Sequence, residues 1–170
     1  PSDVIENFNT QKRFPMEDRN LNPHEYVILR DQKNPQNIVA GRYDALQKAV
    51  VPLRVPPKGV WGVQPRNLEQ SFVLDALLDD SIPLVSLVGK AGTGKTLLAI
   101  AAGLHKTLDE GHFQRLLVSR PIFPMGRDIG YLPGDIEQKL NPWMQPIFDN
   151  VEFLMGADKK AAGRAQELIN

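Results

Sequence analysis

The residues best suited to chemistry lie between Gly89 and Thr96, in the sequence GKAGTGKT. This stretch matches G-x-x-x-x-G-K-[S/T] at every fixed position, the pattern of a phosphate-binding loop. Its glycines let the backbone fold tightly and approach an anion closely, so that the loop amides can point inward around phosphate groups. In such a loop Lys95 meets the β- and γ-phosphates, and the Thr96 hydroxyl is a ligand of Mg²⁺.

The nucleotide contacts are expected along the whole loop and into the first turn of the helix that follows it. Lys95 and Thr96 are the predicted catalytic residues, because phosphoryl transfer depends mainly on positioning and charge neutralisation. The sequence has no N-K-x-D guanine signature, which favours ATP over GTP. The predicted cofactor-binding residues in this segment are Gly89, Lys90, Ala91, Gly92, Thr93, Gly94, Lys95, Thr96 and Leu97.

A magnesium-dependent NTPase usually needs a second acid, at the end of a buried strand. FVLD, which ends at Asp75, has helical spacing and precedes the loop, and FDNVEF, at residues 148–153, has its acids interspersed. Neither segment fits the requirement. We therefore expect this chain to bind ATP and to hydrolyse it poorly.

Apolar segments on both sides of the loop predict the elements that position it. Residues 81–88 (SIPLVSLV) and 114–120 (QRLLVSR) are apolar on both faces, which is typical of buried parallel strands. Residues 95 to about 108 have a helical pattern. Strand, helix and strand in this order predict a right-handed βαβ unit and an α/β fold with a parallel sheet.

Further elements are expected before and after this unit. A helix is expected from Asn67, with Asn67 as N-cap and Gln70 in a capping box. Residues 121–134 form a long predicted loop, and a helix follows over 135–154, interrupted near Pro142 and Pro146.

The first 60 residues are predicted to be a small β-hairpin connector. Residues 25–30 and 37–44 are expected to form the hairpin around the turn-rich DQKNPQ. Residues 48–55 are a candidate third strand, for which Pro52 indicates an edge position. Residues 55–65 have the composition of a linker, so we expect domains at 1–60 and 61–170.

Composition indicates a globular, cytoplasmic protein. There is no cysteine, which excludes disulfides and thiolate zinc sites, and no apolar run of about 18 residues that could span a membrane. Basic and acidic residues number 20 each, so net charge provides no evidence for nucleic-acid binding. The absence of an initial Met and the uncapped helical pattern at the end suggest a truncated fragment of a longer polypeptide.

Three segments together resemble the PhoH family of P-loop ATPases. They are PRNLEQSFVLDALLDD, VGKAGTGKTLLAIAAGL and SRPIFPMGRDIGYLPGDIEQKLNPWMQPIFDN. The resemblance covers residues 60–156, and the block at 126–150 is its most specific part. The segment before it resembles the connector of longer members that carry an N-terminal PIN-type ribonuclease domain.

This resemblance implies a RecA-like P-loop NTPase core, helicase-like ATP hydrolysis with Mg²⁺, and work on RNA, with single-stranded RNA as the expected form. It also implies a homo-oligomer, with a hexameric ring as one form. The family's acidic strand motif, sensor residues and arginine finger would lie beyond Asn170. The alternative for this chain is a binding or assembly module that responds to ATP without turnover.

Four further residues are candidates outside the loop. Gln70 matches the place where helicase-like enzymes keep a glutamine, whose amide can read adenine; its competing role is the helix cap, and Gln64 is the second candidate. Arg120 ends the second predicted strand and is a candidate for phosphate or nucleic acid, or a surface residue that closes the strand. Arg127, in the long loop, resembles a family position and is a candidate contact for RNA or for a neighbouring subunit's nucleotide.

Overall fold

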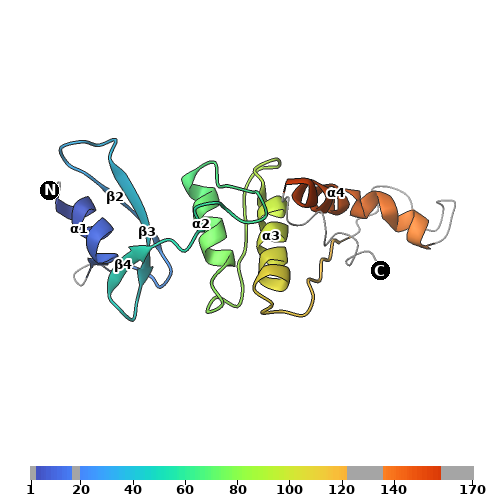
Figure 1. The fold of residues 1–170 in the computed structure, drawn as a ribbon, viewed down its shortest axis with the longest axis horizontal. Coiled ribbons are helices and arrows are strands. Elements are labelled where there is room, and N and C mark those ends of the chain that lie inside the picture. The colour runs from blue at the N-terminus through green and yellow to red at the C-terminus, as the bar shows by residue number, and fades with distance from the viewer. Residues whose placement is uncertain (1–2, 17–19, 122–135, 158–170) are drawn as a thin grey trace. The chain divides into compact units, whose positions relative to one another are not determined.

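The computed structural model describes residues 3–16, 20–121 and 136–157, without the side chains of residues 3, 136–143 and 157. The chain divides into two compact units. Figure 1 labels most of their helices and strands. Unit 1 contains Pro1–Val55 and Pro65–Ser81. Unit 2 contains Pro56–Gln64 and Ile82–Asn170.

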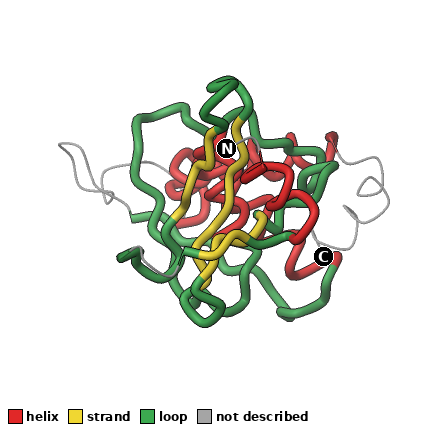
Figure 2. Tube along the Cα trace, turned by 90° about the vertical axis from the view of Figure 1, so that its left-hand side faces the viewer, coloured by secondary structure: helices red, strands yellow, loops and turns green. Residues whose placement is uncertain are grey.

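Unit 1 is built on an antiparallel sheet of four strands in the order β1-β4-β3-β2. Figure 2 shows these strands side by side. The predicted hairpin is confirmed, because β2 pairs with β3 from Tyr26 opposite Arg42 to Arg30 opposite Ile38. The strands are β1 (Phe14–Pro15), β2 (Tyr26–Arg30), β3 (Ile38–Asp44) and β4 (Ala49–Pro52).

The predicted third strand is also confirmed as β4, but its expected edge position is wrong. β4 lies between β1 and β3. β1 pairs only with Ala49 and Val50, whereas Pro52 pairs with Gly41 of β3. A proline has no N–H group for a second neighbour, and here the two-residue β1 does not extend to the position opposite Pro52.

A helix that the sequence patterns did not reveal covers one face of this sheet. α1 (Asp3–Gln11) contributes Phe8, which is packed with Leu29 and Val50 in the core of unit 1. With only nine residues, α1 is too short for a clear helical period, and the two-residue β1 is too short for alternation. The contacts of Phe8 with Leu29 and Val50, which are far apart in sequence, hold α1 on the sheet.

The predicted helix after Asn67 is confirmed as α2 (Leu68–Leu77). Its N-cap is also confirmed, because the Oδ1 atom of Asn67 accepts a hydrogen bond of 2.9 Å from the N–H of Gln70. This contact satisfies one of the N–H groups that has no partner inside the helix.

The described part of unit 2 contains two α-helices, both predicted. α3 (Lys95–Leu104) continues into a π-helical turn, η1 (His105–Asp109), and packs on α4 (Ile136–Ala157). α4 runs without a break through Pro142 and Pro146, so the expected interruption is wrong. The two missing N–H groups are four residues apart and fall on one side of the helix, so the remaining hydrogen bonds can continue.

The two parallel strands predicted beside the loop are not formed. Among the described residues, neither 81–88 nor 114–120 pairs with another strand, and no parallel sheet is seen. Leu84, Val88 and Leu117 are 84%, 95% and 81% exposed. A strand exists only where a neighbouring backbone supplies hydrogen bonds, and an apolar run does not show where that neighbour is. The observed fold is mixed α/β with an antiparallel sheet.

Candidate nucleotide-binding site

The loop predicted to hold phosphate leads directly into α3. Gly92 and Gly94 have φ angles of +76° and +85°, which glycine adopts without the steric cost of a side chain. Gly94 is the N-cap of α3, and its carbonyl accepts the first helical hydrogen bond, of 2.9 Å, from the N–H of Leu98. The N–H groups of Lys95, Thr96 and Leu97 precede that bond and are thus available to an anion.

The side chain of Lys95 folds back into this loop. Its Nζ atom donates to the carbonyl oxygens of Gly89 at 2.8 Å and Lys90 at 2.6 Å. It also donates to the Thr93 hydroxyl at 3.2 Å. The cation therefore lies among the loop atoms that are predicted to surround phosphate.

The loop is open to an incoming ligand. Its residues from Gly89 to Thr93 are exposed, and a β-carbon built on Gly92 would have no contact within 4 Å among the residues that the structure describes. The Thr96 hydroxyl belongs to an exposed residue in the first turn of α3. Oxygen ligands and bound phosphate are what Mg²⁺ prefers, so the residues present fit MgATP.

The other predicted site residues lie in different parts of the chain. Gln64 is an exposed residue of unit 2, and Arg120 is exposed at the end of a segment without secondary structure. Gln70 belongs to unit 1, where its Oε1 atom accepts a 2.8 Å hydrogen bond from the N–H of Arg66. That contact belongs to the helix cap, and the adenine role of Gln70 stays a prediction. Arg127 lies outside the described residues.

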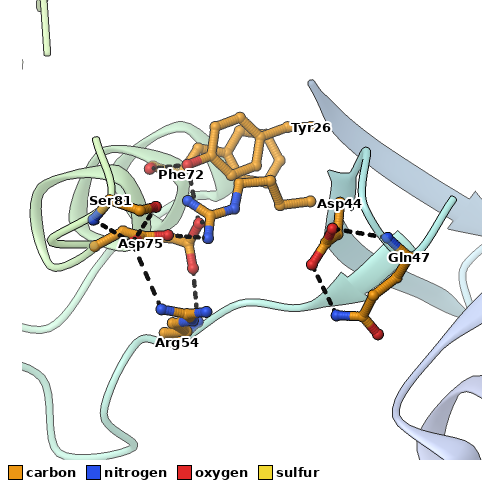
Figure 3. A network of polar contacts seen from close by, with 9 residues as sticks. Tyr26, Asp44, Gln47, Arg54, Phe72, Asp75 and Ser81 are labelled. Carbon is orange, nitrogen blue, oxygen red and sulfur yellow. Dashed lines mark hydrogen bonds and ion pairs between the residues drawn. The ribbon is translucent and has the colours of Figure 1, made fainter. Parts of the chain in front are cut away.

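A second polar cluster, which the sequence did not reveal, lies inside unit 1 (Figure 3). The Arg42 side chain pairs with two acids from the α2 region: its Nε atom is 3.4 Å from Asp75 and its Nη2 atom contacts Asp79. Arg54 adds a 2.7 Å hydrogen bond from its N–H to Asp75 and an ion pair with Asp79 at 3.5 Å. Asp75, the acid of FVLD, is thus a fully buried partner of arginine.

Tyr26 completes this cluster from the sheet side. Its ring stacks on Phe72 with centroids 4.4 Å apart. Its hydroxyl lies 2.8 Å from the Phe72 carbonyl oxygen and 3.0 Å from Asp75. Burial, with the charge of Asp75 and the hydrogen bond to it, raises the pKa of Tyr26 far above its usual value. The hydroxyl therefore stays protonated, and the cluster attaches α2 to β2 and β3.

Asp79 is charged despite its burial. Burial by itself would raise the pKa of Asp79, but hydrogen bonds from Ser81 and the contact with the Arg42 guanidinium outweigh it and hold the pKa well below its usual value. Beside Asp79 lies a cavity of about 540 Å³, whose lining includes Arg42, Arg54 and the turn between β3 and β4. None of the predicted nucleotide-binding residues lines this cavity. In the described part of the chain, no group of three or more acids and histidines is arranged to hold a metal ion.

Comparison with known proteins identifies the group to which this chain belongs. A family model described as PhoH-like protein matches residues 62–170, a range that includes α2, the phosphate loop, α3 and α4. The chain belongs to the PhoH family. The resemblance inferred from the sequence is thereby confirmed, and membership implies a P-loop domain, nucleotide binding and a role related to the PhoH ATPase.

Curated relatives support the same assignment. Protein PhoH2 of Bacillus subtilis is 49% identical over 137 residues, which cover 81% of this chain and 31% of that protein. Protein PhoH2 of Mycolicibacterium smegmatis is 44% identical over 67% of this chain and 26% of its own length. This PhoH chain thus spans less than a third of the length of these relatives. No solved structure matches it.

No described helix of this PhoH chain combines the length and the apolar character needed to cross a membrane.

Proposed function

We propose that this PhoH chain is the ATP-binding module of an ATPase that couples hydrolysis to the remodelling, unwinding or decay of RNA. The observation that carries the proposal is the junction of loop and helix. There α3 begins at the left-handed Gly94, and the Lys95 cation bonds back to the carbonyl oxygen of Gly89 in the same loop. Positive charge and unpaired N–H groups at a helix N-terminus are what a triphosphate requires.

Each group has a distinct role in this proposal. The loop amides and the start of α3 bind the β- and γ-phosphates. Lys95 leaves its loop carbonyls to neutralise the charge on the same phosphates, and the Thr96 hydroxyl is a ligand of Mg²⁺. The metal, when bound, would bridge the phosphates and offset their charge during transfer. Arg120 and Arg127 are proposed contacts for single-stranded RNA or for a neighbouring subunit.

The wider assignment rests on the family. PhoH membership and the resemblance to members with a PIN-type ribonuclease domain support RNA as substrate, a cytoplasmic setting and a homo-oligomeric ring. Because the chain spans less than a third of its PhoH2 relatives, turnover of the whole protein is part of the proposal.

The primary test is Lys95→Ala. We expect this variant to lose at least roughly tenfold in MgATP affinity by calorimetry, since a charge-assisted contact with phosphate disappears. Lys33→Ala is the control, because Lys33 is an exposed lysine at the turn between β2 and β3. Equal affinity in Lys95→Ala and the unmodified chain would refute the site.

Measurements of ATP turnover and of oligomer size distinguish the proposed ATPase from the alternative, a module that assembles in response to ATP without hydrolysis. Steady-state ATP hydrolysis that rises on addition of single-stranded RNA, and falls in Lys95→Ala, would support coupling to RNA. ATP-dependent growth of the oligomer, measured by light scattering without hydrolysis, would instead support an assembly module.

Base recognition is tested by Gln70→Ala and Gln64→Ala. Because Gln70 takes part in the cap of α2, we expect Gln70→Ala to lower stability without changing the preference for ATP over GTP. A selective loss of that preference would instead support adenine recognition by the substituted glutamine.

A further inference from the structure

The phosphate loop contains a closed set of hydrogen bonds around the Lys95 ammonium. An ammonium group has three donors, and three loop oxygens accept from it: the carbonyls of Gly89 and Lys90 and the hydroxyl of Thr93. Two of these acceptors are backbone atoms that no substitution removes. The third is a side chain, so Thr93 is the one acceptor that a substitution can remove.

The Thr93 hydroxyl is itself oriented by the loop. It donates to the carbonyl oxygen of Lys90 at 2.9 Å, which is also an acceptor for Lys95. With its proton directed at that carbonyl, the hydroxyl turns a lone pair toward the Lys95 ammonium, 3.2 Å away. Thr93 is placed for this by its neighbours, because Gly92 and Gly94 both have the left-handed conformation that bends the loop around it.

We propose that Thr93 is a positioning residue that holds Lys95 retracted in the nucleotide-free loop and releases it when a triphosphate enters. The proposal deepens the proposed function and rests on MgATP binding at this loop. With all three protons bonded to loop oxygens, the ammonium must leave these partners before it can meet a β- or γ-phosphate. The Thr93 contact therefore opposes nucleotide binding.

The direction in which MgATP affinity changes when the Thr93 hydroxyl is removed distinguishes this role from a direct contact with phosphate. Removing the Thr93 acceptor makes Lys95 easier to recruit, so MgATP binding tightens. If the Thr93 hydroxyl instead bonded to phosphate, its removal would weaken binding. A hydroxyl that only supports the fold of the loop would also weaken binding, or leave it unchanged.

The experiment compares Thr93→Val with Thr93→Ser. Valine has nearly the shape of threonine without the hydroxyl, and serine keeps the hydroxyl. We expect Thr93→Val to bind MgATP and magnesium pyrophosphate roughly threefold more tightly by calorimetry, as suits one hydrogen bond in an exposed loop. Thr93→Ser should bind like the unmodified chain.

A second measurement needs no nucleotide. The acylation rate of the Lys95 amine, followed by mass spectrometry, should rise roughly threefold in Thr93→Val, because the ammonium has lost one of its stabilising acceptors. The rate in Thr93→Ser should stay as in the unmodified chain. The exposed Lys58 of the same unit serves as internal reference.

The outcomes separate the two proposals. Unchanged or weaker MgATP binding in Thr93→Val, or an unchanged Lys95 acylation rate, would overturn the role of Thr93 and leave the nucleotide site intact. An unmodified chain that fails to bind MgATP would overturn the proposed function and, with it, the release of Lys95 by nucleotide. Faster acylation would then show only that Thr93 retains the lysine.

Discussion

Arg42 is a buried cation of unit 1 that pairs with two buried acids. It is 6% exposed and lies between Asp75 and Asp79, which are 0% and 3% exposed. Buried charges are tolerated when they are paired, but loss of one partner leaves an uncompensated charge in a poorly solvated place. Arg42 therefore determines whether both acids can stay buried.

We predict that Arg42→Met lowers the free energy of unfolding by about 3–5 kcal/mol, because two buried carboxylates lose their cation. Urea denaturation would measure this loss. Arg54→Ala is the matched control: the Arg54 side chain is 64% exposed and 3.5 Å from Asp79, and exposed pairs contribute at most about 1 kcal/mol. Equal losses in the two variants would contradict the assigned importance of burial.

A pH dependence follows from Asp79. Its pKa is lowered in the folded chain, so the folded state binds this proton less readily than the unfolded state, where the ordinary value is about 3.9. The stability contributed by Asp79 is thus fully present above that value and is lost as the pH falls further below it.

Urea midpoints measured from pH 7 down to pH 3 should therefore fall most steeply below about pH 4. In Asp79→Asn, which cannot titrate at this position, the fall should be smaller. A variant that kept the full acid dependence would show that other carboxylates, such as those of Asp31 and Asp44, cause it.

At the scale of elements, a close approach between strands requires glycine at position 41. A β-carbon there would lie 2.6 Å from the carbonyl oxygen of Val51, 2.5 Å from a Val50 methyl group and 3.1 Å from the Phe8 ring. The first of these is backbone that belongs to the β3–β4 pairing and cannot rotate away.

We predict that Gly41→Ala destabilises unit 1 by about 1–3 kcal/mol, the usual cost of overpacking. Gly103→Ala is the comparison: its β-carbon would meet Leu116 at 2.7 Å, but the contact is the end of a side chain that is 36% exposed and can turn aside. Thermal unfolding should show a smaller loss of stability for Gly103→Ala than for Gly41→Ala. A larger loss there would mean that Leu116 is held firmly against α3.

Helices were more predictable than strands in this chain, and the hydrogen bonds explain why. The bonds of α2, α3 and α4 are local, so their periodicity and the Asn67 cap were visible in the sequence. The hairpin was visible because its turn joins partners that are close in sequence. The segments 81–88 and 114–120 have strand-like composition, but their pairing depends on backbone elsewhere.

At the scale of the molecule, the chain consists of two units, each formed by two separate stretches of the sequence. The chain crosses from one unit to the other after residues 55, 64 and 81. The family match begins at residue 62 and thus includes α2, which is grouped with the sheet of unit 1. The predicted domain boundary near residue 60 therefore stays a proposal.

Hydrogen exchange would show how independent the units are. We predict that Arg42→Met speeds exchange of the amides of β2, β3 and α2, whereas the amides of α3 keep their rates, because Arg42 pairs within unit 1. MgATP should slow exchange at the start of α3 in both proteins. A uniform rise in both units would show that they unfold together.

The sequence by itself determined the phosphate loop and the helix that follows it, because glycines, lysine and threonine at fixed spacing act through a local backbone conformation. It also determined membership of the PhoH family. Only the tertiary structure decided the buried pairing of Arg42 with Asp75 and Asp79 and the contact between Thr93 and Lys95. These contacts depend on which side chains lie next to one another in the folded chain, and residue types and spacing do not specify that arrangement.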